Sequence, residues 1–360
     1  MTKTLSFPSV YEATVQEYYT SNDPILGFSK IKFDGIDYIV GIQALNEGTS
    51  PHKTINSSPS GNEYKLIGQS ALVLASNIYL ENSKSLNFPK ISLTVGFPYA
   101  TFQFNRDAAV EYLKSESTIT YYKSDERGNL ASEQRLIPIA NVNVIPEIMG
   151  CDYSIRNGET PIDGNFIIIS LGYGTCEGAL STPNGLVNRT IFSTHGLSYA
   201  VKIFSQELNK NTFMHLKTEH QIDQIFVKGF TFVDRKLKKL GEEKKMALCL
   251  YYKNVISPTI SKYISDGDFE NSNQIILAGG GAYCTDLIDL FNEEFGNICK
   301  ISVASQPEFC ASVGYAIYSK HSKKNQENEM GSDNFYFADN AVAYVGIDIG
   351  NANTCVSVLD

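Results

Sequence analysis

The sequence predicts an α/β protein of two domains, and three observations support this. The chain has 360 residues, which is enough for two domains of ordinary size, each with its own core. Buried apolar runs typical of strands alternate with helical stretches along the chain. Three of these strands end in a glycine-containing turn, and the three turns are spread over both expected domains.

The composition is that of a globular protein rather than a disordered one, with 42% hydrophobic and 19% charged residues. A net charge of −9 argues against a general nucleic-acid or anionic-membrane surface, so any DNA contact should run through a partner. No apolar run reaches the roughly 18 residues that span a bilayer, and residues 1–4 do not resemble a signal peptide. We therefore expect a cytoplasmic protein without a membrane partner. The seven scattered cysteines predict free thiols, and the five histidines show no zinc spacing.

Local patterns predict the elements of the first 145 residues. A short strand with a proline, an Asp-Gly hairpin turn and a glycine-ended apolar run are the clearest signals. In chain order we expect a strand at 5–10, a hairpin at 31–40, a polar loop at 45–64, a helix at 66–79, a buried strand at 91–95, a helix at 105–115 and strands between 116 and 145.

The second half of the chain shows the same alternation, followed by a polar tract. The tract has the composition of a flexible connector. We expect a strand at 166–169 pairing with 187–192, a helix at 197–208, a largely helical region at 231–266 with the charge run 235–245 on its solvated face, a strand at 275–278, a helix from about 284, a strand at 301–303, a helix at 308–319, the connector at 320–338 and a hairpin at 345–359.

The last hairpin carries Asp348 and Gly350 at its tip. Such a tip suits a nucleotide phosphate, because glycine lets the backbone come close and an aspartate can hold hydrated Mg²⁺. The other two turns are Gly172-Tyr173-Gly174-Thr175 and Gly279-Gly280-Gly281. The sequence contains no P-loop motif, and the second of these turns is not part of a dinucleotide fingerprint.

Taken together, these motifs resemble those of the actin-like ATPases, and the resemblance covers almost the whole chain. Residues 348–354 are similar to the first phosphate motif, 171–175 to the second and 276–282 to the adenosine motif. Val144-Ile145-Pro146-Glu147 resembles the segment that supplies the catalytic acid, and residues 307–314 resemble the second connecting helix. Residues 7–10 and 95–98 are similar to local patterns of the ParM, plasmid-segregation branch.

The resemblance implies a two-domain, RNase H-like fold with ATP or ADP and Mg²⁺ in a cleft between the domains. It implies that Asp348 holds Mg²⁺ through water and that Glu147 orients or deprotonates the attacking water. The residues expected to bind the nucleotide are Gly350, Asn351, Asn353, Thr354, Ser170, Gly172, Tyr173, Gly174, Thr175, Gly279, Gly280, Gly281 and Ala282.

Two positions depart from the family pattern. Ser170 stands where the second phosphate motif usually has an aspartate, and Cys355 stands where actin and ParM place a lysine that contacts phosphate. Slow hydrolysis is therefore expected, and nucleotide binding is better supported than turnover.

The motif order also differs, because the first phosphate motif lies last in this chain. Placing residues 341–360 before residue 1 restores the family order, so the sequence resembles a circular permutant. This predicts that strand 356–359 lies beside strand 4–10 in one sheet. The expected domains are residues 1–160 with 305–360, including the connector, and residues 161–304.

Two functions remain open from the resemblance. The first is an ATP-dependent protein that polymerises into filaments and acts in plasmid segregation through a DNA-binding adaptor. The second is a small-molecule kinase of the same fold, acting on a sugar or pantothenate-like substrate. A scaffold of the same fold that does not hydrolyse ATP is a further alternative because of Ser170.

Overall fold

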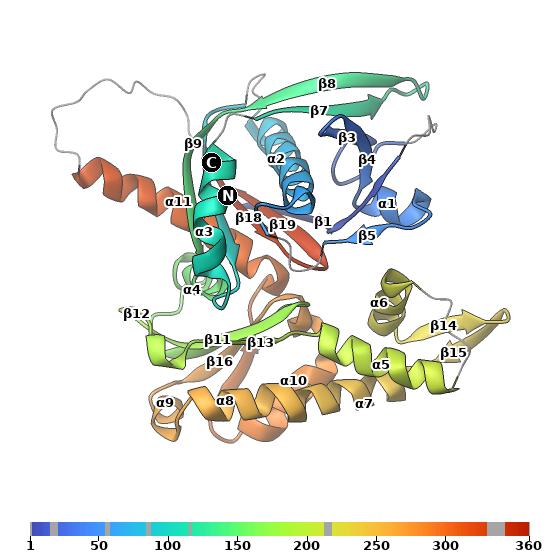
Figure 1. Ribbon diagram of the computed structural model, residues 1–360. Coiled ribbons are helices and arrows are strands. Elements are labelled where there is room, and N and C mark those ends of the chain that lie inside the picture. Colours follow the sequence, from blue (N-terminus) through green and yellow to red (C-terminus); the bar gives the residue numbers. More distant parts are fainter. Residues whose placement is uncertain are drawn as a thin grey trace. The chain divides into compact units, whose positions relative to one another are not determined.

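The computed structural model describes residues 2–14, 21–54, 58–83, 88–114, 117–211, 218–329 and 343–359. The chain divides into two compact units, residues 1–162 with 309–360 (unit 1) and residues 163–308 (unit 2). Figure 1 shows that each unit combines β-sheet with helices.

Unit 1 contains a five-stranded mixed sheet in the order β1-β19-β18-β6-β9. The strands are β1 (Lys3–Pro8), β19 (Asn353–Leu359), β18 (Ala343–Ile349), β6 (Ile91–Phe97) and β9 (Ile139–Pro146). β18 and β19 form an antiparallel hairpin, and β6 and β9 run parallel to β18. β1 pairs with β19 from Lys3 opposite Val358 to Pro8 opposite Asn353, which confirms the predicted contact between these strands.

Helices cover both faces of this sheet. The helices of unit 1 are α1 (Ile42–Glu47), α2 (Asn62–Ser83), α3 (Phe102–Lys114), α4 (Glu147–Asn157) and α11 (Cys310–Glu329). α2 packs near Ile349 of β18, whereas α11 lies against Gly346 of the same strand. Because odd and even positions of a strand point to opposite faces, the two helices cover opposite faces of the sheet. α4 and α11 touch at Gly150 and Gly314, where a Cβ on Gly314 would lie 1.7 Å from the carbonyl oxygen of Gly150. Only glycine allows this close backbone contact.

A second sheet of unit 1 has the order β5-β2-β4-β3-β7-β8. Its strands are β2 (Val10–Ala13), β3 (Lys30–Phe33), β4 (Ile36–Val40), β5 (His52–Lys53), β7 (Ser117–Ser124) and β8 (Leu130–Ile137). The predicted Asp34-Gly35 hairpin turn is present, with positive φ angles of 50° and 79°. The region 45–64 is less irregular than expected, because it contains the end of α1, all of β5 and the start of α2. Residues 55–57 of it lie outside the described residues.

Unit 2 is built on a sheet in the order β12-β11-β10-β16-β17, with β13 paired to β11. These strands are β10 (Phe166–Leu171), β11 (Thr175–Thr182), β12 (Gly185–Leu186), β13 (Phe192–His195), β16 (Gln274–Ala278) and β17 (Lys300–Val303). The helices are α5 (Ser198–Asn211), α6 (Glu219–Lys228), α7 (Gly241–Tyr251), a π-helical turn (Tyr252–Ile256), α8 (Ser257–Tyr263), α9 (Asp266–Glu270) and α10 (Thr285–Phe295). Short 3-10 turns occur at Asn188–Thr190, Gly280–Tyr283 and Pro307–Phe309.

One prediction for unit 2 is wrong, and another holds only in part. β10 pairs with β11 rather than with residues 187–192, because the chain reverses immediately at Gly172. The predicted helical region 231–266 is confirmed from Gly241 onward, but residues 230–239 form a hairpin of β14 (Phe230–Val233) and β15 (Lys236–Lys239). Aromatic and β-branched residues alternate in β14, and Asp234 and Arg235 take the positive φ angles that a tight hairpin turn requires.

The two main sheets share one topology. In each sheet, the first strand of an antiparallel hairpin (β18–β19 or β10–β11) pairs on its other side with a parallel strand (β6 or β16). That strand pairs in turn with a second parallel strand (β9 or β17). In unit 2 the hairpin comes first along the chain, whereas in unit 1 it comes last. The polar tract 320–338 differs from the prediction, because α11 continues to Glu329 before the described residues stop.

Candidate functional site

In unit 1, the predicted acids lie at the carboxyl ends of neighbouring strands. Asp348 is the last residue but one of β18, and Glu147 begins α4 directly after β9. Phe97, the last residue of β6, pairs with Pro146 and so lies between the two. The carboxyl ends of parallel strands are the usual place for a ligand in α/β proteins.

The two carboxylates influence one another. Burial raises the pKa of Asp348 well above its ordinary range, and the neighbouring Glu147 carboxylate raises it further. Neither residue as a whole is fully buried. Two close carboxylates that repel each other favour either a proton or a cation between them.

These residues fit a hydrated magnesium ion. Mg²⁺ usually keeps several waters and is held by one or two carboxylates together with substrate phosphates. The described part of the chain has no group of three or more His, Cys, Asp or Glu that could form a complete protein cage. Burial raises the pKa of Tyr64, and this residue is close enough to Asp348 for the charge of that carboxylate to raise it further. Its hydroxyl has no hydrogen-bond partner among the described residues, so the site leaves a buried polar atom for a ligand or water.

The β18–β19 turn is compact. The amide of Gly350 donates to the carbonyl oxygen of Asn353 at 3.1 Å, and a Cβ on Gly350 would lie 2.7 Å from that oxygen. Thr354 is buried and its hydroxyl is 2.8 Å from that of Ser9, so this predicted ligand residue ties the turn to β1. Asn351 is partly exposed and Asn353 is exposed.

The β10–β11 turn of unit 2 has the same form. A Cβ on Gly172 would lie 2.7 Å from the carbonyl oxygen of Thr175, again three residues further on. The carbonyls of Gly172, Tyr173 and Gly174 accept hydrogen bonds from the amides of Leu197, Ser198 and Gly196 at 2.9 to 3.0 Å. These bonds fix the turn against the start of α5. The hydroxyl of Tyr173 donates to Asp223 Oδ1 on α6 at 2.7 Å.

The Gly279–Gly281 turn packs against the end of β10. Gly279 has φ +77°, which favours glycine, and its amide donates to the carbonyl of Pro307 at 2.7 Å. A Cβ on Gly279 or Gly281 would lie within 2.8 Å of the Leu171 carbonyl oxygen. Gly280 is exposed and Ala282 is buried. The structure thus brings the second and third predicted turns together within unit 2.

Sequence reasoning missed Glu177. This fully buried glutamate of β11 lies opposite Ser170 of β10, whereas in unit 1 Asp348 lies opposite Cys355. Unit 2 therefore places its carboxylate on the second strand of the hairpin rather than the first. A glutamate inside the otherwise apolar or small-residue strand 175–182 was the available signal.

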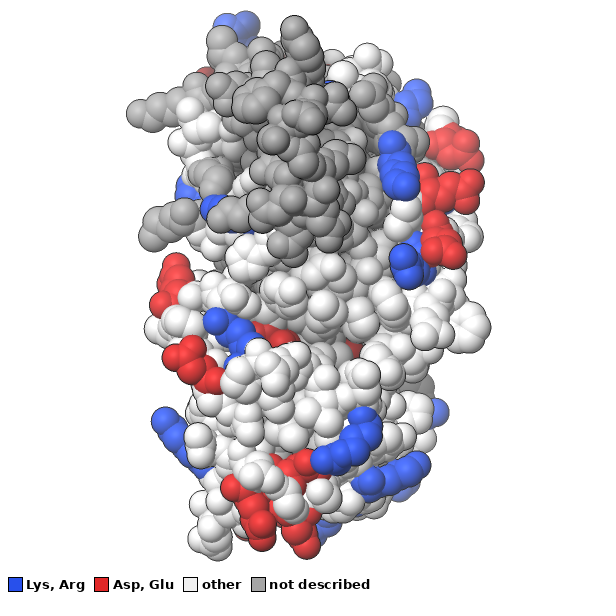
Figure 2. All heavy atoms as spheres, turned by 90° about the vertical axis from the view of Figure 1, so that its left-hand side faces the viewer, with Lys and Arg blue, Asp and Glu red and all other residues white. Residues whose placement is uncertain are grey.

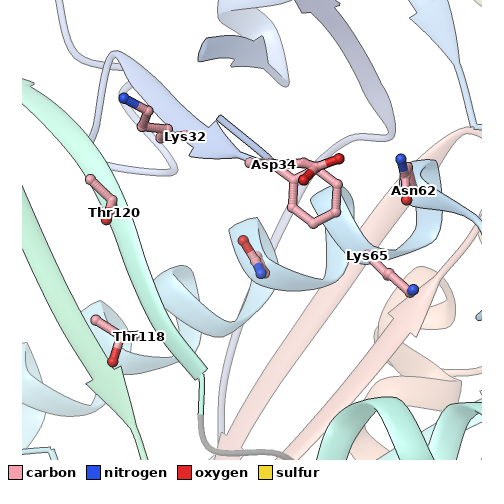
Figure 3. Close-up of a pocket in the computed structure, with 8 residues that line it drawn as sticks. Lys32, Asp34, Asn62, Lys65, Thr118 and Thr120 are labelled. Atoms are coloured by element: carbon pink, nitrogen blue, oxygen red, sulfur yellow. The ribbon is translucent and has the colours of Figure 1, made fainter. Parts of the chain in front are cut away.

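A separate cavity of unit 1 contains none of the predicted site residues. It measures about 380 Å³ and is lined by Lys32, Phe33, Asp34, Asn62, Lys65, Gln69, Thr118 and Thr120. In Figure 3 the amino groups of Lys32 and Lys65 point away from one another, so they do not converge on a common anion.

Comparisons with known proteins agree with this architecture. Residues 2–150 match the family model of the N-terminal domain of actin-like proteins. No curated protein sequence matches the chain. A ParM filament structure from Clostridium botulinum is 17% identical with a TM-score of 0.68, covering 88% of this chain and 92% of that one.

Two further solved structures are similar over comparable lengths. The archaeal actin homologue Ta0583 in complex with ADP is 18% identical with a TM-score of 0.61, covering 88% of this chain and 92% of that one. ParM of Bacillus thuringiensis with ATP is 15% identical with a TM-score of 0.54, covering 89% and 92%. The chain therefore has the two-domain α/β fold of these actin-like proteins. No helix among the described residues is long and apolar enough to cross a membrane.

Proposed function

We propose that this chain, whose fold is actin-like and whose residues 2–150 match the actin-like protein model, is an ATP-binding protein that assembles into nucleotide-dependent filaments. The observation that carries the proposal is the identical form of the Gly350 and Gly172 turns, each at the end of the first strand of the same sheet topology. The structures that share the fold include one with ATP, one with ADP and one of a filament.

In this proposal the two hairpin turns bind the phosphates of ATP through backbone amides, together with Asn351, Asn353 and the Thr175 hydroxyl. The Gly279–Gly281 turn and Ala282 receive the adenosine, since glycine allows close approach to the backbone. Ser170 and Thr354 support the turns from their strands.

Asp348 holds hydrated Mg²⁺, which when bound neutralises charge on the phosphates. Glu147 orients the attacking water and accepts its proton. Its place at the start of α4, close enough to Asp348 to raise the pKa of that carboxylate, suits this role. Ser170 in place of a carboxylate favours slow hydrolysis, which would let a polymer persist before it weakens.

The chain order supports a circular permutation of the actin-like order. β19 pairs with β1 along six residue positions, so the end of one strand lies next to the start of the other. Unit 2 shows the same topology with its hairpin first. In this order the polar tract 320–338 is the joint between the former ends.

The most direct test of the filament is sedimentation with ATP, with ADP and without nucleotide. We expect polymer to pellet with ATP and less of it with ADP. Absence of polymer at high concentration, together with ATP turnover that a sugar or pantothenate-like molecule stimulates, would favour the small-molecule kinase instead. A role in plasmid segregation requires a DNA-binding adaptor, and co-sedimentation of such a protein with the polymer tests it.

A further inference from the structure

The β14–β15 hairpin of unit 2 presents an apolar face that nothing in the described chain covers. Phe232 is 61% exposed and its cross-strand partner Leu237 is 53% exposed. Phe230 lies edge-on to Phe232, with ring centroids 6.4 Å apart, and Val227 at the end of α6 is also exposed. Figure 1 shows the hairpin at one end of unit 2. Contiguous exposed apolar side chains of this kind mark interaction sites.

The hairpin and its flanking segments also carry positive charge. Basic residues outnumber acidic ones in the segment 227–245, in a chain whose net charge is −9. The exposed basic residues are Lys228, Arg235, Lys236, Lys239 and Lys245, and the exposed acidic ones are Asp234 and Glu242. The name basic surface is used below for this part of unit 2. It comprises the apolar side chains Val227, Phe230, Phe232 and Leu237 together with the exposed basic residues of the same segment. Its partner must therefore be acidic and partly apolar.

An acidic surface of this kind lies elsewhere in unit 2. Asp266 and Glu270 of α9 and Glu293 and Glu294 of α10 are exposed. The rings of Phe269 and Phe295 stack 5.2 Å apart, which holds these two helices side by side. Ile298, 59% exposed, follows α10 and adds an apolar side chain, and the neighbouring segments also carry the exposed Lys262 and Lys300. Figure 2 shows acidic side chains, flanked by basic ones, gathered in the lower part of the face on which α9 lies.

The two surfaces lie at opposite ends of the strands of unit 2. α9 and the end of α10 lead into the first residues of β16 and β17. The hairpin follows α6, which Tyr173 ties to the turn at the carboxyl end of β10. A surface rich in lysine cannot pair with its own copy, so the contact must join unlike surfaces. Contacts between unlike surfaces that do not close into a ring generate open polymers.

We propose that the basic surface of one copy of this chain docks on the acidic surface of the next copy, and that the Tyr173–Asp223 hydrogen bond couples this contact to the nucleotide. α6 begins with a Thr218–Gln221 capping box and ends at Gly229, which leads directly into β14. A movement of the β10–β11 turn is thereby passed to α6 and then to the hairpin. The inference rests on the proposed function, because it assigns the surfaces of that polymer.

Sedimentation with ATP of the double variant Phe232→Ser, Leu237→Ser tests the docking surface. Both side chains are exposed, so the variant is expected to fold and to bind ATP as before. We expect its critical concentration for polymerisation to rise at least about tenfold. The matched control is Leu130→Ser with Leu136→Ser, two exposed leucines on β8 of unit 1, which should polymerise like the original chain.

A charge exchange identifies the acidic partner. Lys239 lies opposite Phe230 and so shares the face of Phe232 and Leu237. Lys239→Glu should strongly weaken the polymer, and adding Glu293→Lys to the same chain should restore it. Failure of this restoration contradicts the assigned partner. Asp223→Ala removes the acceptor of this hydrogen bond; it should keep ATP binding but reduce the difference between polymerisation in ATP and in ADP, and an unchanged difference contradicts the coupling.

The outcomes separate this inference from the proposed function. If the original chain polymerises and binds ATP, but the hairpin variants polymerise equally well, only the docking surface is wrong. If the original chain forms no polymer under any nucleotide, the filament function fails and the docking inference fails with it.

Discussion

Gly350 and Gly172 occupy the same position in two matching turns, one in each unit of the chain. In both, a Cβ on the glycine would lie 2.7 Å from the carbonyl oxygen of the residue three positions further on. This distance is too short for any side chain, so the backbone itself forms the surface of each turn. In our proposal these two turns are the central elements of the nucleotide site.

Replacing either glycine should therefore damage binding more than folding. Gly350→Ala forces the turn to open, and we expect the affinity for ATP to fall at least about tenfold, which corresponds to about 1.4 kcal/mol. Calorimetric titration measures this. Gly241→Ala is the control, because a Cβ there meets nothing within 4 Å. Unchanged affinity in Gly350→Ala would contradict the role of the turn.

Glu147→Gln should separate hydrolysis from binding. The amide keeps the size of the side chain but cannot accept a proton, so phosphate release should slow by about 100-fold or more. Nucleotide affinity should stay the same or rise slightly, because the repulsion between Glu147 and Asp348 is removed. Release of phosphate at the original rate would show that Glu147 is not the base.

Unit 2 should lose stability in acid through one ion pair. Two nitrogen atoms of Arg189 donate to Asp268 at 2.9 and 2.6 Å, and Ser265 donates to the same carboxylate. The Arg189 guanidinium and these hydrogen bonds hold the pKa of Asp268 well below its ordinary range. The stabilisation is therefore fully present above the ordinary aspartate pKa of about 3.9, and it disappears as the pH falls from there towards the lowered value.

Asp268→Asn removes this contribution at neutral pH. We expect urea denaturation at pH 7 to show a loss of about 1–3 kcal/mol, since charge-assisted bonds to a buried carboxylate are broken. The variant and the original chain should converge in stability as the pH is lowered below 3. An equal difference at both pH values would contradict the assigned role of the charge.

The proposed permutation can be reversed. A chain that begins at residue 330, continues through residue 360 into residue 1 and ends at residue 329 should fold and bind ATP like the original. β19 and β1 are already paired, with Lys3 opposite Val358, so only a short turn is needed between them. Circular dichroism and thermal melting measure the fold. Failure of the rearranged chain to fold would contradict the proposed order.

Much of this fold could be predicted from the sequence where a local signal coincided with a tertiary requirement. The apolar strands at 91–97, 166–171 and 274–278 were clear because both of their faces are buried. The Asp34-Gly35 turn was clear because its positive φ angles demand these residues. The pairing of β19 with β1 was predicted from the order of the motifs along the chain, not from any local sequence pattern.

The errors arose where local signals were ambiguous. Residues 230–239 carry many lysines, which fit a helical surface as well as an edge hairpin, and only the alternation of Phe230 and Phe232 indicated a strand. The polar composition of 320–329 concealed a helix because α11 is held by its packing at Gly314 and Tyr315 further upstream. Glu177 could not be assigned, since its place opposite Ser170 depends on strand register.

Calorimetric titration of the original chain with ATP in the presence of Mg²⁺ is the most direct test of whether this chain binds ATP. We expect one ATP to bind per chain, and EDTA or Asp348→Asn to weaken the binding. Absence of any heat of binding for ATP or ADP at concentrations up to millimolar would contradict it.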